Sequence, residues 1–468
     1  MGRGQDARWI GVFAAYFALQ ALSRWLLGGT SLNWDEAEAF FFARNLAWGY
    51  GPQPPLYFWM QWGVFQLLGE GVLALTAFKN LLLLGGMALL YRFLRREVGP
   101  APAGVATLSL GLVAPLVWEM QRALTHTALA MLVAVAALWL AVRALERGRW
   151  GDYLLLGLAV GLGTLSKLNF LVWAAALLLA ALALPEWRGR VRWVRVLGAA
   201  ALAAALNGPA ALWMLRNPEW STVGLQRLEP TADGGWAARL EGTGALAVAA
   251  LNLLILPLLV LGGYWWVARR RPRGEGLPPG VRLYGLASAL TLGLLWAMVL
   301  VTGSTEIDHI WLIPLASGLV PVAVLALWPR LSGRGRRGLA GAAAGLWLLA
   351  MVGLPLSGVV SPSTSNRGLD VGPLAARLGV LEAEGRVVAT GNVHLAGNLV
   401  LREPGLGLRI LRPGARDLPE GPAALVGRPN DPLLESSEVL RRMEGTEIFE
   451  LLPGVEARRQ VVTRLAPR

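Results

Sequence analysis

The chain has 468 residues, of which 55% are hydrophobic and 16% are charged, and its mean hydropathy is +0.50. Soluble domains are much less apolar, so this composition excludes an ordinary soluble protein, and the absence of cysteine excludes disulfides and thiolate metal sites. A formal net charge of +13 would suggest nucleic acid binding in a soluble protein, but the arginines are placed in a way that gives the charge another meaning.

The first apolar segment, residues 9–27, is long enough to cross a bilayer. It follows Arg3 and Arg8, and no small-residue cleavage site comes after it. We therefore expect a retained transmembrane helix and not a cleaved signal peptide.

The loop after this segment reads NWDEAEAFFFARNLAWGYGPQPPLY over residues 33–57. Asn33 and Glu36 have the spacing of a capping box, and acids in a first turn favour the helix dipole, so we expect a helix over 34–47. Glycine and proline then break it, and an aromatic second helix follows over 56–68. Two such helices are typical of segments that lie on a membrane surface.

Ten further apolar segments follow, and with the first they predict about eleven transmembrane helices, of which the fifth is short. These segments cover residues 73–94, 101–118, 123–142, 153–166, 168–185, 196–215, 244–268, 283–302, 309–328 and 338–358.

Hydrophobicity falls after residue 360, which divides the chain into a membrane domain, residues 1–360, and a C-terminal domain, residues 361–468. The segments of this tail predict a small soluble α/β domain. Strands are expected over 385–391, 406–414, 421–427 and 446–452, and amphipathic helices over 371–385 and 431–443.

Arginines are concentrated in every second connection between the apolar segments, and acids are concentrated in the others. Short arginine-rich loops stay in the cytoplasm, so the N-terminus is expected inside and the tail outside, in the periplasm or extracellular space. This topology explains the positive charge and excludes nucleic acid as a partner. The chain is expected to be a multi-pass protein of the inner (plasma) membrane, in contact with membrane lipids.

The outer loop resembles a known family. An acidic DE pair after the first helix, a tryptophan-containing helix that ends in GY, and then PPL resemble the GT-C glycosyltransferases. Within them the pattern is similar to the bacterial branch that includes the aminoarabinose lipid A transferases, related to the protein O-mannosyltransferases. The stretches GLGTLSKLNFLV, TEIDHIWLIPL and VVATGNVHLAGNLVLREPG resemble later segments of the same family.

Two positions depart from the family pattern. His126, in LTHTAL, stands where the family usually has an acid, and Gln53 stands before the prolines where His or Lys is common. These changes put in doubt any metal or donor contact of the missing acid and suggest an altered specificity for sugar or lipid.

The resemblance implies a polyprenyl-phosphate-linked sugar donor, a lipid, glycan or protein acceptor, and Asp35 as the catalytic base. Such a transfer needs a carboxylate that accepts the acceptor's proton and cations that stabilise the departing phosphate. With one base and no covalent intermediate, we expect inversion at the anomeric carbon. Glu36 is the supporting acid, and the candidates for the donor phosphate are Lys167, Arg122, His126 and His309.

Further candidates surround this site, and each also has a structural explanation. Lysines can extend to the interface, a helical histidine can be an ordinary hydrogen-bonding residue, tryptophans form interface belts, and Glu36 can simply cap its helix. A cluster of acids leaves a divalent metal open as a cofactor. The further candidates are Lys79, Trp34, Trp48, Gln53, Pro54, Pro55, Glu306 and Asp308.

Two other classes of function are compatible with a polytopic membrane protein. A lipid or glycolipid transporter would place ionisable residues near the bilayer midplane and often has repeated halves. A structural protein would need neither Asp35 nor Lys167. The ionisable residues collect at one face and no internal repeat is visible, which favours an enzyme.

Overall fold

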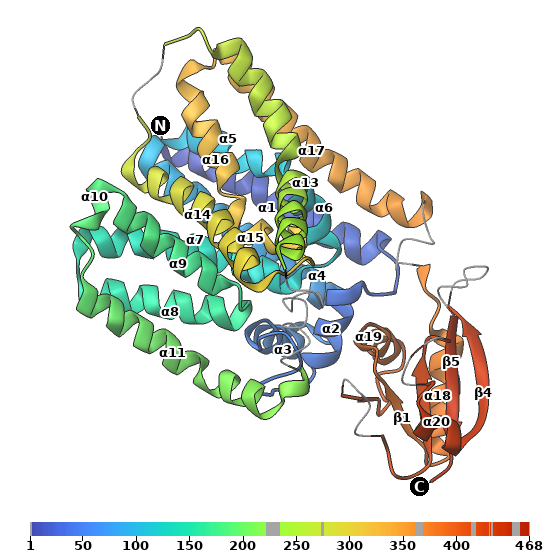
Figure 1. Ribbon diagram of the computed structural model, residues 1–468. Coiled ribbons are helices and arrows are strands. Elements are labelled where there is room, and N and C mark those ends of the chain that lie inside the picture. Colours follow the sequence, from blue (N-terminus) through green and yellow to red (C-terminus); the bar gives the residue numbers. More distant parts are fainter. Residues whose placement is uncertain are drawn as a thin grey trace.

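The computed structural model describes residues 2–220, 235–272, 276–360, 368–412, 418–429, 431, 434–451 and 459–467. Helices form most of the molecule, and the C-terminal residues form an α/β unit beside one end of the helical part (Figure 1). The linker SPSTSN expected between the two parts, residues 361–366, lies outside the described residues.

Long apolar helices dominate the N-terminal part, so the chain is a polytopic helical membrane protein, as its composition predicts. Within the described residues seven helices are long and apolar enough to cross a membrane. They are α1 (Gly2–Leu27), α4 (Val72–Val98), α7 (Thr125–Arg147), α11 (Trp193–Arg216), α13 (Trp236–Ala268), α14 (Pro279–Thr302) and α17 (Gly333–Val360).

The expected count of about eleven spans is not confirmed, because several apolar segments are short or broken. The segment 101–118 bends by 68° between its two halves and counts at most as an eighth span. Pro115 begins the second half, and a proline there has no N–H with which to continue the preceding helix. The pieces are α5 (Pro100–Leu108), η1 (Ser109–Leu112) and α6 (Ala114–Arg122).

The segment 309–328 is also divided, with prolines at positions 314 and 321. Its pieces are η2 (His309–Trp311), α15 (Ile313–Ala316), α16 (Leu319–Leu327) and η3 (Trp328–Arg330). The remaining short helices of this part are α8 (Trp150–Ser166), α9 (Phe170–Ala183) and α10 (Pro185–Arg188).

The arginine-rich connections meet at one end of the helical bundle. Ion pairs join the start of α1 to the end of α4, the end of α4 to the end of α7, the end of α7 to the start of α8, and α10 to the start of α14. These pairs are Asp6–Arg95, Arg96–Glu146, Arg143–Asp152 and Glu186–Arg282. The alternation of charge in the sequence therefore corresponds to two chemically different ends of the bundle.

The opposite end carries the first loop, which forms α2 (Trp34–Phe42) and α3 (Leu56–Leu68). The two helices are confirmed, but the expectation that the first extends to residue 47 is wrong. The chain turns at Ala43, and the Tyr50 hydroxyl donates to Asn45 O and accepts from Ala47 N, each at 2.7 Å. The Tyr50 hydroxyl therefore holds the chain after Ala43 in a turn and provides the Ala47 N–H with an acceptor outside a helix.

The C-terminal unit is a five-stranded sheet of order β2-β1-β3-β5-β4, in which β1 is parallel to β2 and β3, and β5 is antiparallel to β3 and β4. Helices α18 and α19 pack on one face of the sheet and α20 on the other. The four expected strands are present, whereas α19 and β5 were not expected from the sequence. The elements are α18 (Gly372–Ala383), β1 (Val387–Thr390), α19 (Val393–Arg402), β2 (Arg409–Ile410), β3 (Ala423–Gly427), α20 (Ser437–Arg442), β4 (Met443–Glu450) and β5 (Arg459–Leu465).

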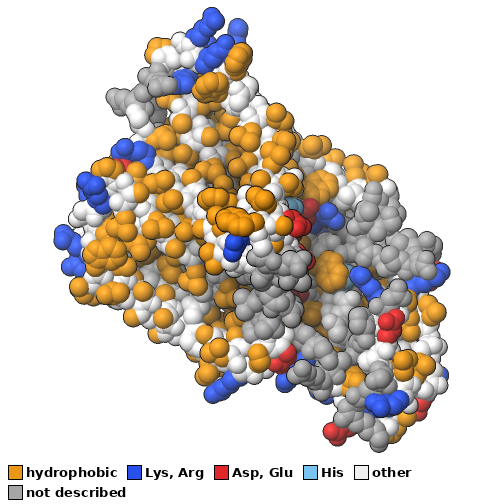
Figure 2. All heavy atoms as spheres, in the orientation of Figure 1, with side chains coloured by type: hydrophobic (Ala, Val, Ile, Leu, Met, Phe, Trp, Pro, Cys, Tyr) orange, Lys and Arg blue, Asp and Glu red, His pale blue; other side chains and the backbone are white. Residues whose placement is uncertain are grey.

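Apolar side chains cover the helical part, whereas acidic and basic side chains and a histidine gather where it meets the C-terminal unit (Figure 2). Helix α19 packs directly against α2 at this boundary. The boundary therefore contains the first residues of the acidic loop.

Candidate active site

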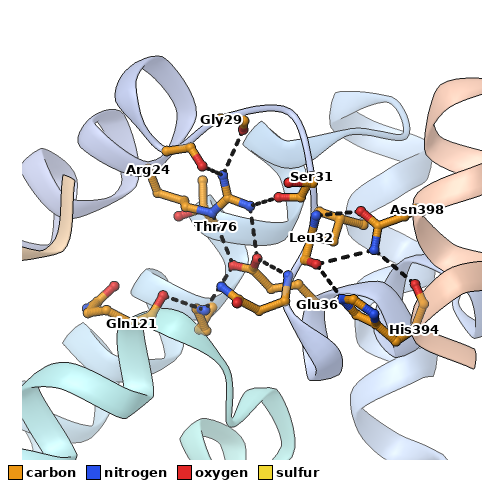
Figure 3. A network of polar contacts seen from close by, with 12 residues as sticks. Arg24, Gly29, Ser31, Leu32, Glu36, Thr76, Gln121, His394 and Asn398 are labelled. Atoms are coloured by element: carbon orange, nitrogen blue, oxygen red, sulfur yellow. Dashed lines mark hydrogen bonds and ion pairs between the residues drawn. The ribbon is translucent and has the colours of Figure 1, made fainter. Parts of the chain in front are cut away.

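The start of α2 is fixed by its own sequence and by a buried ion-pair cluster. Asn33 and Glu36 form the predicted capping box, in which Glu36 Oε2 accepts from Asn33 N at 3.3 Å. The same carboxylate pairs with Arg24 Nη2 at 2.9 Å and Lys79 Nζ at 3.3 Å, and all three side chains are buried (Figure 3). Lys79, one of the further candidates from the sequence, therefore pairs with a carboxylate of the first loop.

Glu36 is a structural anion in this arrangement. Burial by itself would raise the pKa of the Glu36 carboxyl, but Arg24 and Lys79 outweigh it and lower the pKa to about 2. Arg24 also donates to the carbonyl oxygens of Gly28, Gly29 and Ser31, so it ties the end of α1 to the start of α2.

Asp35 faces away from this cluster. Its Oδ2 accepts a 2.8 Å hydrogen bond from the N–H of Leu124, in the connection between α6 and α7. Leu124 has a φ of 62° and is the only residue other than glycine with a positive φ in the described part of the chain. Such backbone strain is often found at functional sites. Burial raises the pKa of Asp35 above its usual range, although the Lys167 charge opposes this effect.

Lys167 ends α8 and provides a cation near Asp35. Its Nζ donates to Thr127 Oγ1 at 2.8 Å. Burial lowers the pKa of Lys167 to about 8, while the Asp35 and Asp308 carboxylates act in the opposite direction. Lys167 therefore lies within electrostatic range of both acids, one from the first outer loop and one from a loop far along the chain.

The loop that carries Asp308 lines a pocket of about 450 Å³ against α13. Asp308 accepts from Ile310 N at 3.1 Å and lies 2.9 Å from His309 Nδ1. Asn169, two residues after Lys167, donates to Trp311 O at 3.3 Å and links the two loops. The pocket is lined by Ala245, Val248, Ala249, Asn252, Glu306, Ile307, Asp308, His309 and Trp311.

His126 is enclosed by protein. It is only 3% exposed, its Nδ1 lies 3.2 Å from the carbonyl oxygen of Ser166, and its ring packs against Tyr57 and Phe58. This geometry does not offer the imidazole to a donor phosphate. Arg122 lies on α6, where it approaches Glu119 at 3.8 Å across one helical turn.

The other candidates divide between the two sides of the first loop. Trp34 stacks on His394 of the C-terminal unit, with ring centres 4.6 Å apart. Trp48 instead packs edge-on against Trp59 of α3, and Pro55 is the N-cap of that helix. Pro54 is buried and Gln53 is partly buried in the connection between α2 and α3.

Glu38 is an acid in this loop that was not among the sequence candidates for the site. It lies one helical turn after Asp35, and burial together with the Asp35 charge raises its pKa to about 8. Arg24 was also missed, although a single arginine at the outer end of the first helix contradicts the charge bias of that face and was a usable signal.

The described acids of this end are spread among different partners. Across the ranges that the structure describes, no three His, Asp or Glu side chains come together as a set of metal ligands. Glu36 instead faces two protein cations, and Asp35 faces a backbone N–H.

Comparison with known proteins identifies relatives of the chain. Residues 52–213 match the family model described as dolichyl-phosphate-mannose-protein mannosyltransferase. The lipopolysaccharide core galacturonosyltransferases RgtB and RgtA of Rhizobium johnstonii are each 34% identical, over 316 and 322 residues. These matches cover 66% and 67% of this chain and 63% of each relative, so the chain spans less than two thirds of their length.

The fold has solved counterparts. ArnT from Cupriavidus metallidurans bound to undecaprenyl phosphate superposes with a TM-score of 0.68 at 16% identity, covering 98% of both chains. The same protein in the apo state gives a TM-score of 0.65 at 15% identity. At these identities the likeness establishes the fold. The family match, the curated relatives and this fold together confirm the resemblance to the GT-C glycosyltransferases that the first loop carries.

Proposed function

We propose that the protein transfers a sugar from a polyprenyl-phosphate donor to a lipid, glycan or protein acceptor, with Asp35 as the general base. One observation carries the proposal: Asp35, Lys167 and Asp308 come from three distant parts of the sequence and interact electrostatically at the same end of the bundle. Converging ionisable groups with shifted pKa values are typical of functional sites.

The proposed reaction is a single displacement. The acceptor oxygen attacks the anomeric carbon, and its proton moves to Asp35. The bond between this carbon and the phosphate oxygen breaks, and its electron pair leaves with the phosphate. Attack opposite to the leaving group inverts the anomeric configuration. The raised pKa of Asp35 makes it a stronger base than an exposed aspartate would be.

Lys167 is the best-placed cation for the departing phosphate, because it is positioned by Thr127 and lies near Asp35. His309 and the adjacent pocket of about 450 Å³ offer room for part of the donor or acceptor. Arg122 is a further cation two residues before Leu124, whose N–H holds Asp35. His126 is assigned a packing role in the wall behind Asp35 because it is enclosed.

Residues 1–360 are the catalytic membrane domain in this proposal, with about eleven spans if the short and broken helices are included, and residues 361–468 are the outer domain. The arginine-rich end faces the cytoplasm of a cell with an inner membrane, and the Asp35 end faces outward. The ArnT structure contains undecaprenyl phosphate, which supports a polyprenyl-phosphate donor here. The sugar is a hexose or a pentose in this proposal, and the names of RgtA and RgtB support a uronic acid as that sugar and a lipopolysaccharide core as one acceptor.

The proposal is tested by mass spectrometry of glycolipids and glycoproteins from cells with and without the gene. We expect one class of molecule to lose one sugar residue in the deletion strain and regain it on complementation. Purified protein should then transfer that sugar from its undecaprenyl-phosphate derivative to the sugar-free acceptor. A complete absence of transfer, with the lipid moved between leaflets instead, would contradict the enzyme and favour a transporter. The same assay with EDTA and added Mg²⁺ determines whether a divalent ion takes part.

A further inference from the structure

The C-terminal unit holds the loop before Asp35 by the backbone of Leu32. Leu32 is fully buried, and its N–H donates to Asn398 Oδ1 at 2.7 Å. Its carbonyl oxygen accepts from Asn398 Nδ2 at 3.2 Å and lies 2.9 Å from His394 Nε2 (Figure 3). We call this group of Leu32, His394 and Asn398 the Leu32 clamp.

The chemistry of the clamp fixes the orientation of its members. A carbonyl oxygen only accepts hydrogen bonds, so His394 Nε2 carries the proton that points to Leu32. Asn398 bonds Leu32 with both ends of its side-chain amide: Oδ1 accepts from the Leu32 N–H, and Nδ2 donates to the Leu32 carbonyl oxygen. A neighbouring β-strand pairs with a backbone in the same way. The N–H and carbonyl groups of a buried loop residue need such partners, and here both are supplied by side chains 366 residues away.

Helices α19 and α2 approach each other closely at this contact. Gly397 of α19 faces the backbone of Ala37 in α2, and a Cβ atom built at Gly397 would overlap the Ala37 carbonyl group. His394 also stacks on Trp34, the first residue of α2. Three contacts therefore set the position of α2: the Leu32 clamp before the helix, the Trp34 stack at its start and the Gly397 approach along it.

From these contacts we propose that α19 is a positioning element for Asp35, with Asn398 and His394 as positioning residues. This inference rests on the proposed function of Asp35. Asp35 comes three residues after Leu32, on a helix of only nine residues. Displacement of Leu32 or of Ala37 therefore shifts the Asp35 carboxylate relative to Leu124 and Lys167, which belong to the membrane part. A misplacement of about 1 Å at a reacting group can lower the rate about 100-fold.

Two variants of the full-length protein test the proposal by different routes. Asn398→Ala removes the polar partner of Leu32, whereas Gly397→Ala keeps every polar group and forces α19 away from α2. Gly379→Ala is the matched control, because Gly379 lies in α18 of the same unit and a Cβ atom there meets open space. Transfer kinetics and hydrogen exchange by mass spectrometry are measured on each protein.

We expect both test variants to lower kcat by about 10- to 100-fold with the donor KM changed by less than about 3-fold, since orientation and not binding is lost. The peptide that contains Leu32 should exchange at least about 10-fold faster in Asn398→Ala. Peptides from β1 and β3 should exchange as in the wild type. The control should match the wild type in every measurement.

His394→Gln provides a rescue comparison, because a glutamine amide can still donate to the Leu32 carbonyl, whereas His394→Leu cannot. We expect the glutamine variant to keep more of its kcat than the leucine variant. Unchanged kcat in Asn398→Ala and Gly397→Ala would overturn the positioning role. Faster hydrogen exchange throughout the C-terminal unit would also overturn it, because the variants would then have unfolded the unit and not only released Leu32. If the wild type itself transfers no sugar, the proposed function fails, and the exchange of the Leu32 peptide still decides whether the clamp exists.

Discussion

The N–H of Leu124 donates to Asp35 Oδ2 at 2.8 Å, across 89 residues of sequence. Leu124 makes this bond from a left-handed backbone conformation that branched, bulky side chains rarely adopt. The bond orients the carboxylate toward the start of α7. The strained connection between α6 and α7 and the first outer loop therefore form one site.

Replacement of Asp35 by Asn tests the general base. The amide keeps an oxygen for the Leu124 N–H but cannot accept a proton, so we expect the transfer rate to fall about 100- to 10,000-fold. Folding should be preserved, as judged by the melting temperature. The control is Glu70→Gln, which neutralises an acid of the same loop that is paired with Arg44 near the surface. A rate close to wild type in Asp35→Asn would remove Asp35 from the mechanism.

The pH dependence of the transfer rate should report the charge state of Lys167. The Lys167 ammonium has a pKa of about 8, so it loses its charge, and with it the phosphate contact, as the pH rises through that value. We expect transfer by the wild type to decline above about pH 8. In Lys167→Arg the side chain stays charged, so any remaining activity should extend to higher pH. If the decline in the arginine variant falls at the same pH as in the wild type, another group is responsible for it.

The two lysines should behave differently when neutralised. Lys79→Met leaves the buried Glu36 with one cation and should mainly lower the melting temperature. Lys167→Met removes a hydrogen bond to Thr127 but breaks no close ion pair among the described residues, so it should mainly lower transfer, with a smaller effect on melting. Thermal unfolding and transfer rates are measured on both variants. A mainly lower transfer rate in Lys79→Met together with a mainly lower melting temperature in Lys167→Met would contradict this assignment.

Glu36→Gln should destabilise the protein by about 3 kcal/mol, because it leaves the buried Arg24 and Lys79 charges without their anion. The folded pKa of Glu36 is about 2, below its ordinary value of 4.5. Its contribution to stability is therefore complete above pH 4.5 and is lost as the pH falls toward 2. This acid-dependent loss should be weaker in the variant. Glu447→Gln, which disrupts a more exposed pair with Arg377, is the matched control and should destabilise the protein much less than Glu36→Gln.

The contribution of Glu38 to stability should depend on pH in the opposite direction to that of Glu36. Its folded pKa of about 8 lies above the ordinary 4.5, so the folded state binds more protons between these values. Its contribution to stability is complete below pH 4.5 and is lost as the pH rises toward 8. We expect Glu38→Gln to flatten the fall of the melting temperature over this range. A fall that is as steep in the variant as in the wild type would show that Glu38 is not protonated in the folded protein.

The sequence was sufficient for features that depend on nearby residues. Apolar runs predict membrane helices because a bilayer requires about 20 consecutive apolar residues, and the capping box of Asn33 and Glu36 depends on a spacing of three. The arginine alternation correctly separates two ends of the bundle. Resemblance of the DE pair to a family singled out Asp35, whose role as the base stays a prediction.

Only the tertiary structure decided which partner each charged side chain takes. Adjacent acids on α2 point in different directions, so Glu36 enters a buried ion-pair cluster while Asp35 meets Leu124. His126 looked available in the sequence but is enclosed by α3 and α8. The bond between Leu32 and Asn398 spans 366 residues. Such contacts depend on how whole helices pack, and no local window of sequence contains both partners.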